Sequence, residues 1–90
     1  MDQKILIESL SMDLLRVALG LYRGSLNMAE RFKKEALKRE AELENQPLNN
    51  YLKKLLQGSK KALYSTSERT AEDILMYSVL FQNFARQQHS

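Results

Sequence analysis

The fold is decided by residues 10–43, which read LSMDLLRVALGLYRGSLNMAERFKKEALKREAEL. At 100° per residue, the large apolar side chains of this stretch fall on one helical face. They are Leu10, Leu14, Val17, Leu21, Met28, Phe32 and Leu43. Pro47 disfavours helical backbone at the residue before it. The sequence therefore predicts one long helix over about residues 10–45, beginning as early as residue 3.

A second helical stretch is predicted after Pro47, over about residues 49–87, with Asn49 or Asn50 as its N-cap. Residues 65–67 either open a new helix as part of a capping box or lie inside a continuous one. Residues 74–81 are apolar except for Ser78, so this segment must be buried from more than one side. A β-strand over 74–81 is the alternative, but no second candidate strand exists to pair with it.

The helix lengths bear on the overall architecture. A compact domain of this length has a radius of gyration of ~12 Å, whereas a helix over 10–45 is ~54 Å long. The sequence therefore predicts an all-α, elongated antiparallel hairpin in a single domain covering residues 1–90. Two helices cannot cover all the apolar surface at 10–28 and 71–85. A homodimer that forms a four-helix bundle is the favoured solution, and a monomeric three-helix bundle is the alternative.

Gly20 and Gly24 form a GxxxG pattern at the edge of the apolar face. A glycine inside a helix costs ~1 kcal/mol relative to alanine. We predict that both glycines lie within the long helix and allow a neighbouring helix to approach closely.

Self-association or binding of a partner is assigned to the apolar side chains that two helices would leave uncovered. The predicted surface consists of Leu15, Leu19, Tyr22, Leu26, Leu75, Met76, Val79 and Leu80.

The sequence predicts no catalytic, cofactor-binding or metal site, and therefore no enzyme. There is no cysteine, and the one histidine, His89, is the penultimate residue. Glu40, Glu42 and Glu44 stand two residues apart along the chain, and residues two apart do not share a helical face, which favours a solvated surface. Ser65 and Ser67 lack a histidine base. We expect no cofactor.

The net charge of +3 comes from residues 45–67, which hold four lysines and no acid. Lys53, Lys54, Lys60 and Lys61 share a helical face, and such a face could contact the phosphates of a nucleic acid or another polyanion. No arginine lies among them to recognise a base edge. Contact with nucleic acid is therefore the weaker interpretation, and a solvated helix face is the stronger one.

No apolar run is long enough to cross a bilayer, and the start MDQKILIES lacks the pattern of a signal peptide. We expect no membrane insertion and a cytoplasmic location. The predicted function is that of a small non-catalytic helical protein that self-associates and serves as a protein–protein interaction or assembly module. The alternative is a nucleic-acid-associated accessory protein that uses the lysine face of residues 53–61.

Overall fold

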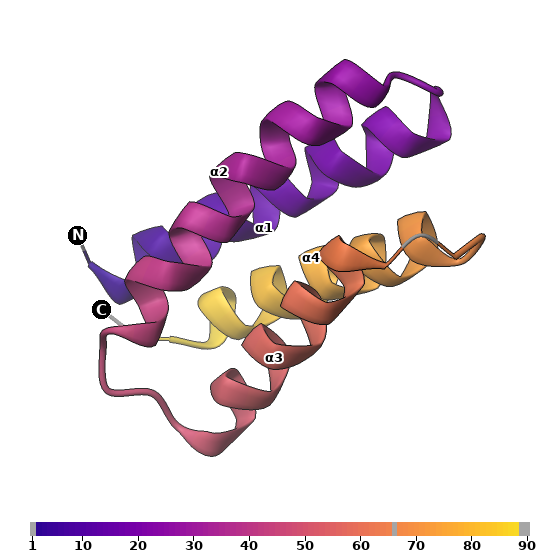
Figure 1. Cartoon of the computed structure of the whole chain (residues 1–90). Helices are drawn as coiled ribbons and strands as arrows, with labels where there is room; N and C mark the ends of the chain where they lie inside the picture. The colour runs from indigo at the N-terminus through magenta and orange to yellow at the C-terminus, as the bar shows by residue number, and fades with distance from the viewer. Residues whose placement is uncertain (1, 66, 89–90) are drawn as a thin grey trace.

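Four α-helices make up the fold, and a computed structural model describes residues 2–65 and 67–88. The helices are α1 (Gln3–Tyr22), α2 (Leu26–Glu44), α3 (Asn50–Tyr64) and α4 (Thr70–Gln87). Each helix runs antiparallel to the next, and the two termini lie at the same end of the bundle (Figure 1). No strand occurs within the described residues. The all-α class is thus confirmed.

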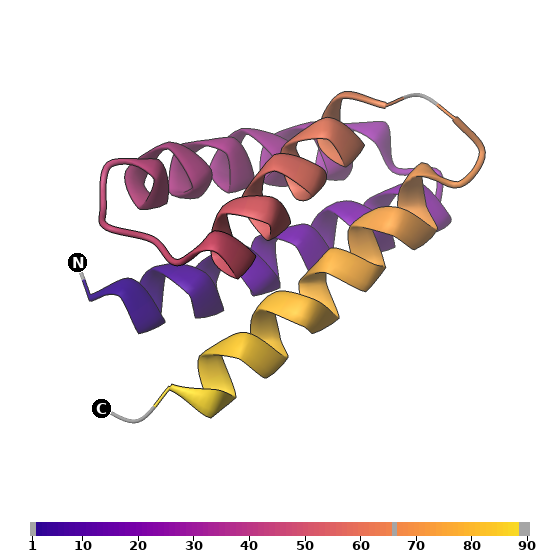
Figure 2. The same cartoon turned by 90° about the horizontal axis from the view of Figure 1, so that it is seen from below.

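The four helices form a bundle in which α1 lies between α2 and α4 (Figure 2). The α1–α2 and α1–α4 interfaces are the most extensive, and the α2–α3 interface is the sparsest. The core is filled mainly by large aliphatic side chains together with Phe81. Its residues that are at most 1% exposed are Leu6, Ile7, Leu10, Leu14, Ala18, Ala36, Leu43, Leu52, Ile74, Phe81 and Ala85.

The predicted continuous helix over 10–45 is wrong, because the chain turns back at residues 23–25. Gly24 has a φ of 70°, a left-handed conformation that glycine adopts without steric penalty. The backbone N–H of Arg23 still bonds to the carbonyl oxygen of Leu19. α1 and α2 bury their apolar faces in the same core, so the apolar spacing continues across the turn and conceals it.

Gly20 lies inside α1 at a close approach to α2, as predicted, whereas Gly24 lies in the turn. A Cβ atom on Gly20 would stand 2.8 Å from the backbone nitrogen of Ala29, closer than van der Waals contact permits. The GxxxG pattern therefore marks a tight turn between two helices of one chain. It does not mark a contact between two unbroken helices.

The second helical stretch is broken, which confirms one of the two options for residues 65–67. The side chain of Asn49 caps α3, as predicted, by accepting a hydrogen bond of 2.8 Å from the N–H of Leu52. The N-cap of α4 is Arg69, without a side-chain hydrogen bond. The predicted capping box is therefore not the start of α4, and Thr66 within it lies outside the described residues. The stretch 74–81 lies within α4 and is helical.

The chain is not elongated. Its radius of gyration is 12.3 Å, and its principal extents are 37 × 21 × 20 Å. Both long stretches fold back on themselves, so four helices of the same chain bury part of the surface that two helices could not cover, while Tyr22, Leu26 and Val79 stay exposed. The predicted elongated hairpin and the three-helix alternative are both wrong in helix number.

Candidate functional site

A cleft of about 570 Å³ lies at the end of the bundle where α1 turns into α2 and α3 turns into α4. All four helices line it. Its apolar lining consists of Val17, Leu21, Tyr22, Leu26, Ala29, Leu63, Tyr64, Ala71 and Ile74. The cleft is within the size range of small-ligand sites, and Leu26 at its rim is 70% exposed. We call this hollow the inter-hairpin cleft.

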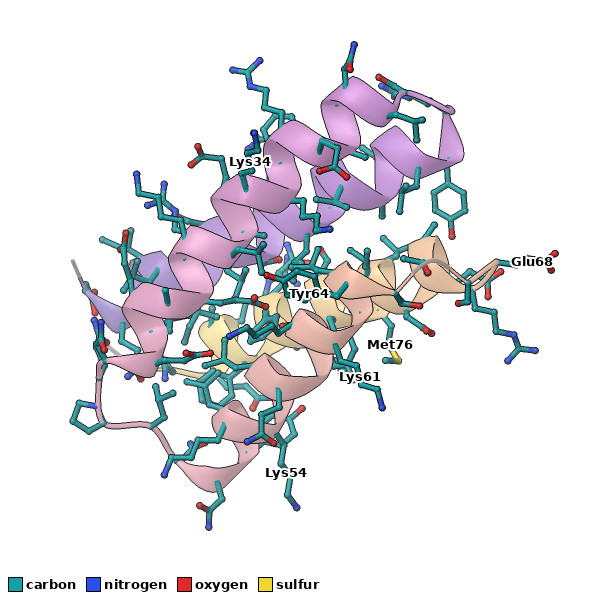
Figure 3. All side chains as sticks on the ribbon, in the orientation of Figure 1. Lys34, Lys54, Lys61, Tyr64, Glu68 and Met76 are labelled. Carbon is teal, nitrogen blue, oxygen red and sulfur yellow. The ribbon has the colours of Figure 1, made fainter. Side chains whose placement is uncertain are left out.

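Polar groups of the inter-hairpin cleft come mainly from the α3–α4 loop. The Thr70 hydroxyl bonds to the Ser65 hydroxyl at 3.2 Å and lies 3.4 Å from the Ser67 hydroxyl. The Lys33 ammonium lies 5.0 Å from the centre of the Tyr64 ring, a cation–π contact that bridges α2 and α3. Glu68 also lines the cleft, but its side chain points away from the helices (Figure 3). The hydroxyls of Ser65, Ser67 and Thr70 thus form a small cluster of hydrogen bonds at the edge of the cleft.

A second candidate surface, with apolar and charged side chains, follows the outer side of α1 and α4. One end of it is a groove between the two helices, lined by Lys4, Glu8, Ser11, Met12, Gln82, Ala85 and Arg86. From Met12, the same helical stripe of α1 continues through Leu15 and Leu19 at steps of three and four. From Gln82, the stripe of α4 continues through Val79 and Leu75. We call Met12, Leu15, Leu19, Leu75 and Val79 the α1–α4 face.

The residues predicted as one surface are thus divided. Leu15, Leu19, Leu75 and Val79 belong to the α1–α4 face, and Tyr22 and Leu26 line the inter-hairpin cleft. Met76 lines a third hollow between α3 and α4, together with Gly58, Lys61 and Tyr77. Leu80 is partly buried and packs against the core.

A pair of buried serines joins α1 to α4. The Ser11 hydroxyl donates to the carbonyl oxygen of Ser78 at 2.8 Å, and the Ser78 hydroxyl donates to the carbonyl oxygen of Ser11 at 2.9 Å. Each hydroxyl is a donor to the other helix, and neither group is charged. The α1–α4 interface is therefore polar at one point without burying a charge.

A buried carboxyl group joins α2 to α3. Glu40 is 1% exposed, and its Oε2 lies 2.5 Å from the Ser59 hydroxyl, which is also buried. Its Oε1 has no hydrogen-bond partner within the described part of the chain. Burial raises the pKa of Glu40 to about 7, although the Ser59 hydroxyl and Lys60 act in the opposite direction. This carboxyl group thus titrates near neutral pH.

The prediction that Glu40 lies on a solvated face is wrong. Glu40 stands four residues after Ala36 and three before Leu43, and both of these are fully buried. The same helical spacing that identified the apolar face therefore includes Glu40. A carboxylate on the buried stripe of a helix was the signal for this site.

Asp13 is a second buried acid, situated between α1 and α2. Arg16 lies 3.7 Å from one of its oxygens and Arg39 lies 3.9 Å from the other. Burial raises the pKa of Asp13, and the two arginines partly oppose this shift. Asp13 thus has cations close to both oxygens, which distinguishes it from Glu40.

The four lysines of the predicted polyanion face are all exposed. Lys54 and Lys61 point away from the bundle (Figure 3). The Lys60 ammonium lies 3.7 Å from a carboxylate oxygen of Glu44 on α2, so one of the four charges is partly neutralised. Their helix, α3, presents its opposite side to the core through Leu52, Leu55 and Leu63.

No group of three histidine, aspartate or glutamate side chains is placed to hold a metal ion within residues 2–65 and 67–88. His89, the remaining candidate for acid–base chemistry, lies outside the described residues. Across that same part of the chain, no helix combines the length and apolar character needed to cross a membrane. Comparison with family models, curated proteins and solved structures finds no match to this chain.

Proposed function

We propose that this chain is a small non-catalytic helical module that self-associates and acts by binding other proteins. The α1–α4 face supports this proposal best. Met12 is 43% exposed and Val79 is 46% exposed, and partly buried leucines continue their stripes along both helices. The chain's own helices leave this surface uncovered. Large apolar side chains grouped on one surface are typical of an interaction site.

Self-association through the α1–α4 face would join the same patch on two copies. A two-fold axis makes such an interface self-complementary. If one residue of the first copy contacts a second residue of the other copy, the reverse contact forms as well. The pair of copies would then hold eight helices. This replaces the earlier expectation of a dimer in which each copy contributes two helices.

Sedimentation velocity over a wide concentration range tests this proposal. We expect the unmodified chain to dimerise, and we expect Met12→Glu and Val79→Glu to shift it toward the monomer, because each places a charge inside the apolar interface. Leu26→Glu is the matched control, since it adds the same charge at an exposed apolar position of the inter-hairpin cleft. A chain that stays monomeric at every concentration would rule out the self-association part.

Contact with a polyanion is a second candidate function, favoured by the exposure of the lysine face on α3. Within the described residues, Lys53, Lys54 and Lys61 have no carboxylate within ion-pair distance. Each phosphate contact steepens the dependence of log K on log salt by roughly 0.9 for duplex DNA. Binding of a DNA or RNA oligonucleotide is therefore compared between the unmodified chain and a variant with all four lysines changed to glutamine. Equal affinities and salt slopes would leave these lysines as a solvated face.

A further inference from the structure

The hydroxyl group of Ser59 has two close oxygen neighbours but carries one proton. Its Oγ lies 2.5 Å from Oε2 of Glu40 and 3.1 Å from the carbonyl oxygen of Leu56. A carbonyl oxygen can only accept a hydrogen bond, whereas a hydroxyl can donate one and accept others. Both contacts are hydrogen bonds at once if Ser59 donates to Leu56 and accepts from a protonated Glu40.

The surroundings of Glu40 also favour its neutral form. The side chain is 1% exposed, and an ionised carboxylate without a bound cation is costly in such a site. Two charged groups act on it: Lys60 of α3 favours the ionised form, and Glu44 of α2 favours the neutral form. The Lys60 ammonium lies within ion-pair distance of Glu44. No ion pair joins Lys60 to Glu40 within the described residues.

The Glu40–Ser59 pair lies where it can affect how α3 packs against α2. It crosses the α2–α3 interface, which is the sparsest of the four. The inter-hairpin cleft opens between the same two helices nearer the other end of α2, where Leu26 and Ala29 face Leu63 and Tyr64 across it. A loss of the Glu40–Ser59 contact would therefore free α3 from α2 and widen the cleft.

We propose that a protonated Glu40, donating to Ser59, holds α3 against α2, and that ionisation of Glu40 loosens this contact because a buried carboxylate is costly and draws water into the interface. The bundle then has a closed form at mildly acidic pH and a looser form, with a wider inter-hairpin cleft, above neutral pH. The raised pKa of Glu40 supports the same conclusion. Nothing in this device depends on the α1–α4 face, so it holds whether or not the chain dimerises.

Carboxyl ¹³C NMR of the unmodified chain gives the first test, because it follows each glutamate separately and requires no variant. We expect the Glu40 carboxyl resonance to titrate near pH 7, well above the value of about 4.3 for a glutamate in a model peptide. A Glu40 resonance that titrates like an exposed glutamate would overturn the proposal.

Amide hydrogen exchange, expressed as the opening equilibrium of each helix, gives the second test. Between about pH 5.5 and pH 8.5, we expect the protection of α3 to fall roughly tenfold or more relative to that of α1. Glu40→Gln keeps the shape and a neutral donor for Ser59, so this fall should disappear. Asp13→Asn is the matched control at the other buried acid, and it should leave the fall unchanged. Equal behaviour of α1 and α3, or a fall that persists in Glu40→Gln, would overturn the proposal.

Discussion

The α1–α4 and α2–α3 interfaces both bury polar side chains, but they satisfy the hydrogen bonds of these groups in different ways. Each pairs antiparallel helices, and each buries a serine hydroxyl that bonds across the interface. Between α1 and α4, two neutral serines satisfy each other's carbonyl oxygens. Between α2 and α3, one serine faces a carboxyl group that still has an oxygen without a hydrogen-bond partner among the described residues. The first contact is independent of pH, whereas the second depends on a proton.

The largest expected effect comes from removing the aromatic side chain of α4. Phe81 is fully buried, and truncation of a buried phenylalanine costs about 3–5 kcal/mol through lost burial and the cavity that remains. We expect Phe81→Ala to lower the free energy of unfolding by this amount in chemical denaturation. Leu37→Ala on α2 is the comparison, because Leu37 is only partly buried, and we expect it to cost much less. Equal costs would contradict the placement of Phe81 in the centre of the core and of Leu37 at its margin.

Glu40→Gln should have the next largest effect, and its sign is stabilising at high pH. The pKa of Glu40 is raised from 4.5 to about 7 in the folded chain. Its neutral form therefore stabilises the fold fully below pH 4.5, and this stability is lost as pH rises through 7. The loss amounts to about 3 kcal/mol, since each unit of pKa shift is worth about 1.4 kcal/mol.

Denaturation of both proteins across pH isolates this contribution of Glu40. The raised pKa of Asp13 acts in the same direction, but it is present in both proteins and cancels in the difference. We expect the Glu40→Gln variant to gain stability relative to the unmodified chain as pH rises from about 4.5 to above 7. A difference that does not change with pH would show that folding does not raise the pKa of Glu40.

The sequence predicts the helical segments better than it predicts the turns that connect them. The apolar spacing correctly predicts the buried face of α1. In α2 the spacing is less exact, because Met28 and Phe32 of the predicted face are only partly buried. It does not report the reversal at 23–25, since Gly24 breaks the helix without disturbing the phase. Asn49 was one of two recognisable N-cap candidates, because asparagine is a preferred N-cap residue and this pair stands just after Pro47.

The candidate surfaces were predictable as residue types, but their grouping was not. Val79 and Tyr22 were both identified as apolar residues in excess of what two helices bury. The structure assigns them to different surfaces, because the turns at both hairpins decide which helices are neighbours. Glu40 was missed for a different reason: a carboxylate was assumed to lie in solvent, and its helical phase with Ala36 and Leu43 was not weighed against that assumption.

Replacing Ser78 and Ser59 by alanine should show that the contribution of the α2–α3 contact to stability depends on pH and that of the α1–α4 contact does not. Ser78→Ala removes a neutral hydrogen bond across α1–α4, which is worth about 1 kcal/mol, and the loss should be the same at acidic and alkaline pH. Ser59→Ala leaves Glu40 without its one partner across α2–α3. We expect this change to cost about 1–3 kcal/mol at acidic pH, and less at alkaline pH, where ionisation of Glu40 has already loosened the contact. A cost that depends on pH in Ser78→Ala but not in Ser59→Ala would reverse the comparison.

Lys60→Gln should have the smallest effect on stability, and this effect should be larger above neutral pH than at acidic pH. Lys60 and Glu44 form a half-exposed ion pair, and such pairs contribute about 0.2–1 kcal/mol. Lys60 also favours the ionised form of Glu40, so its removal should raise the pKa of Glu40 further. The variant should therefore be slightly less stable at acidic pH and more clearly so above neutral pH. Lys54→Gln removes the same charge from α3 at a position without an ion pair among the described residues, and should leave the pH profile in place. If both variants shift the profile equally, Glu40 responds to the net charge of α3 and not to its neighbour across the α2–α3 interface.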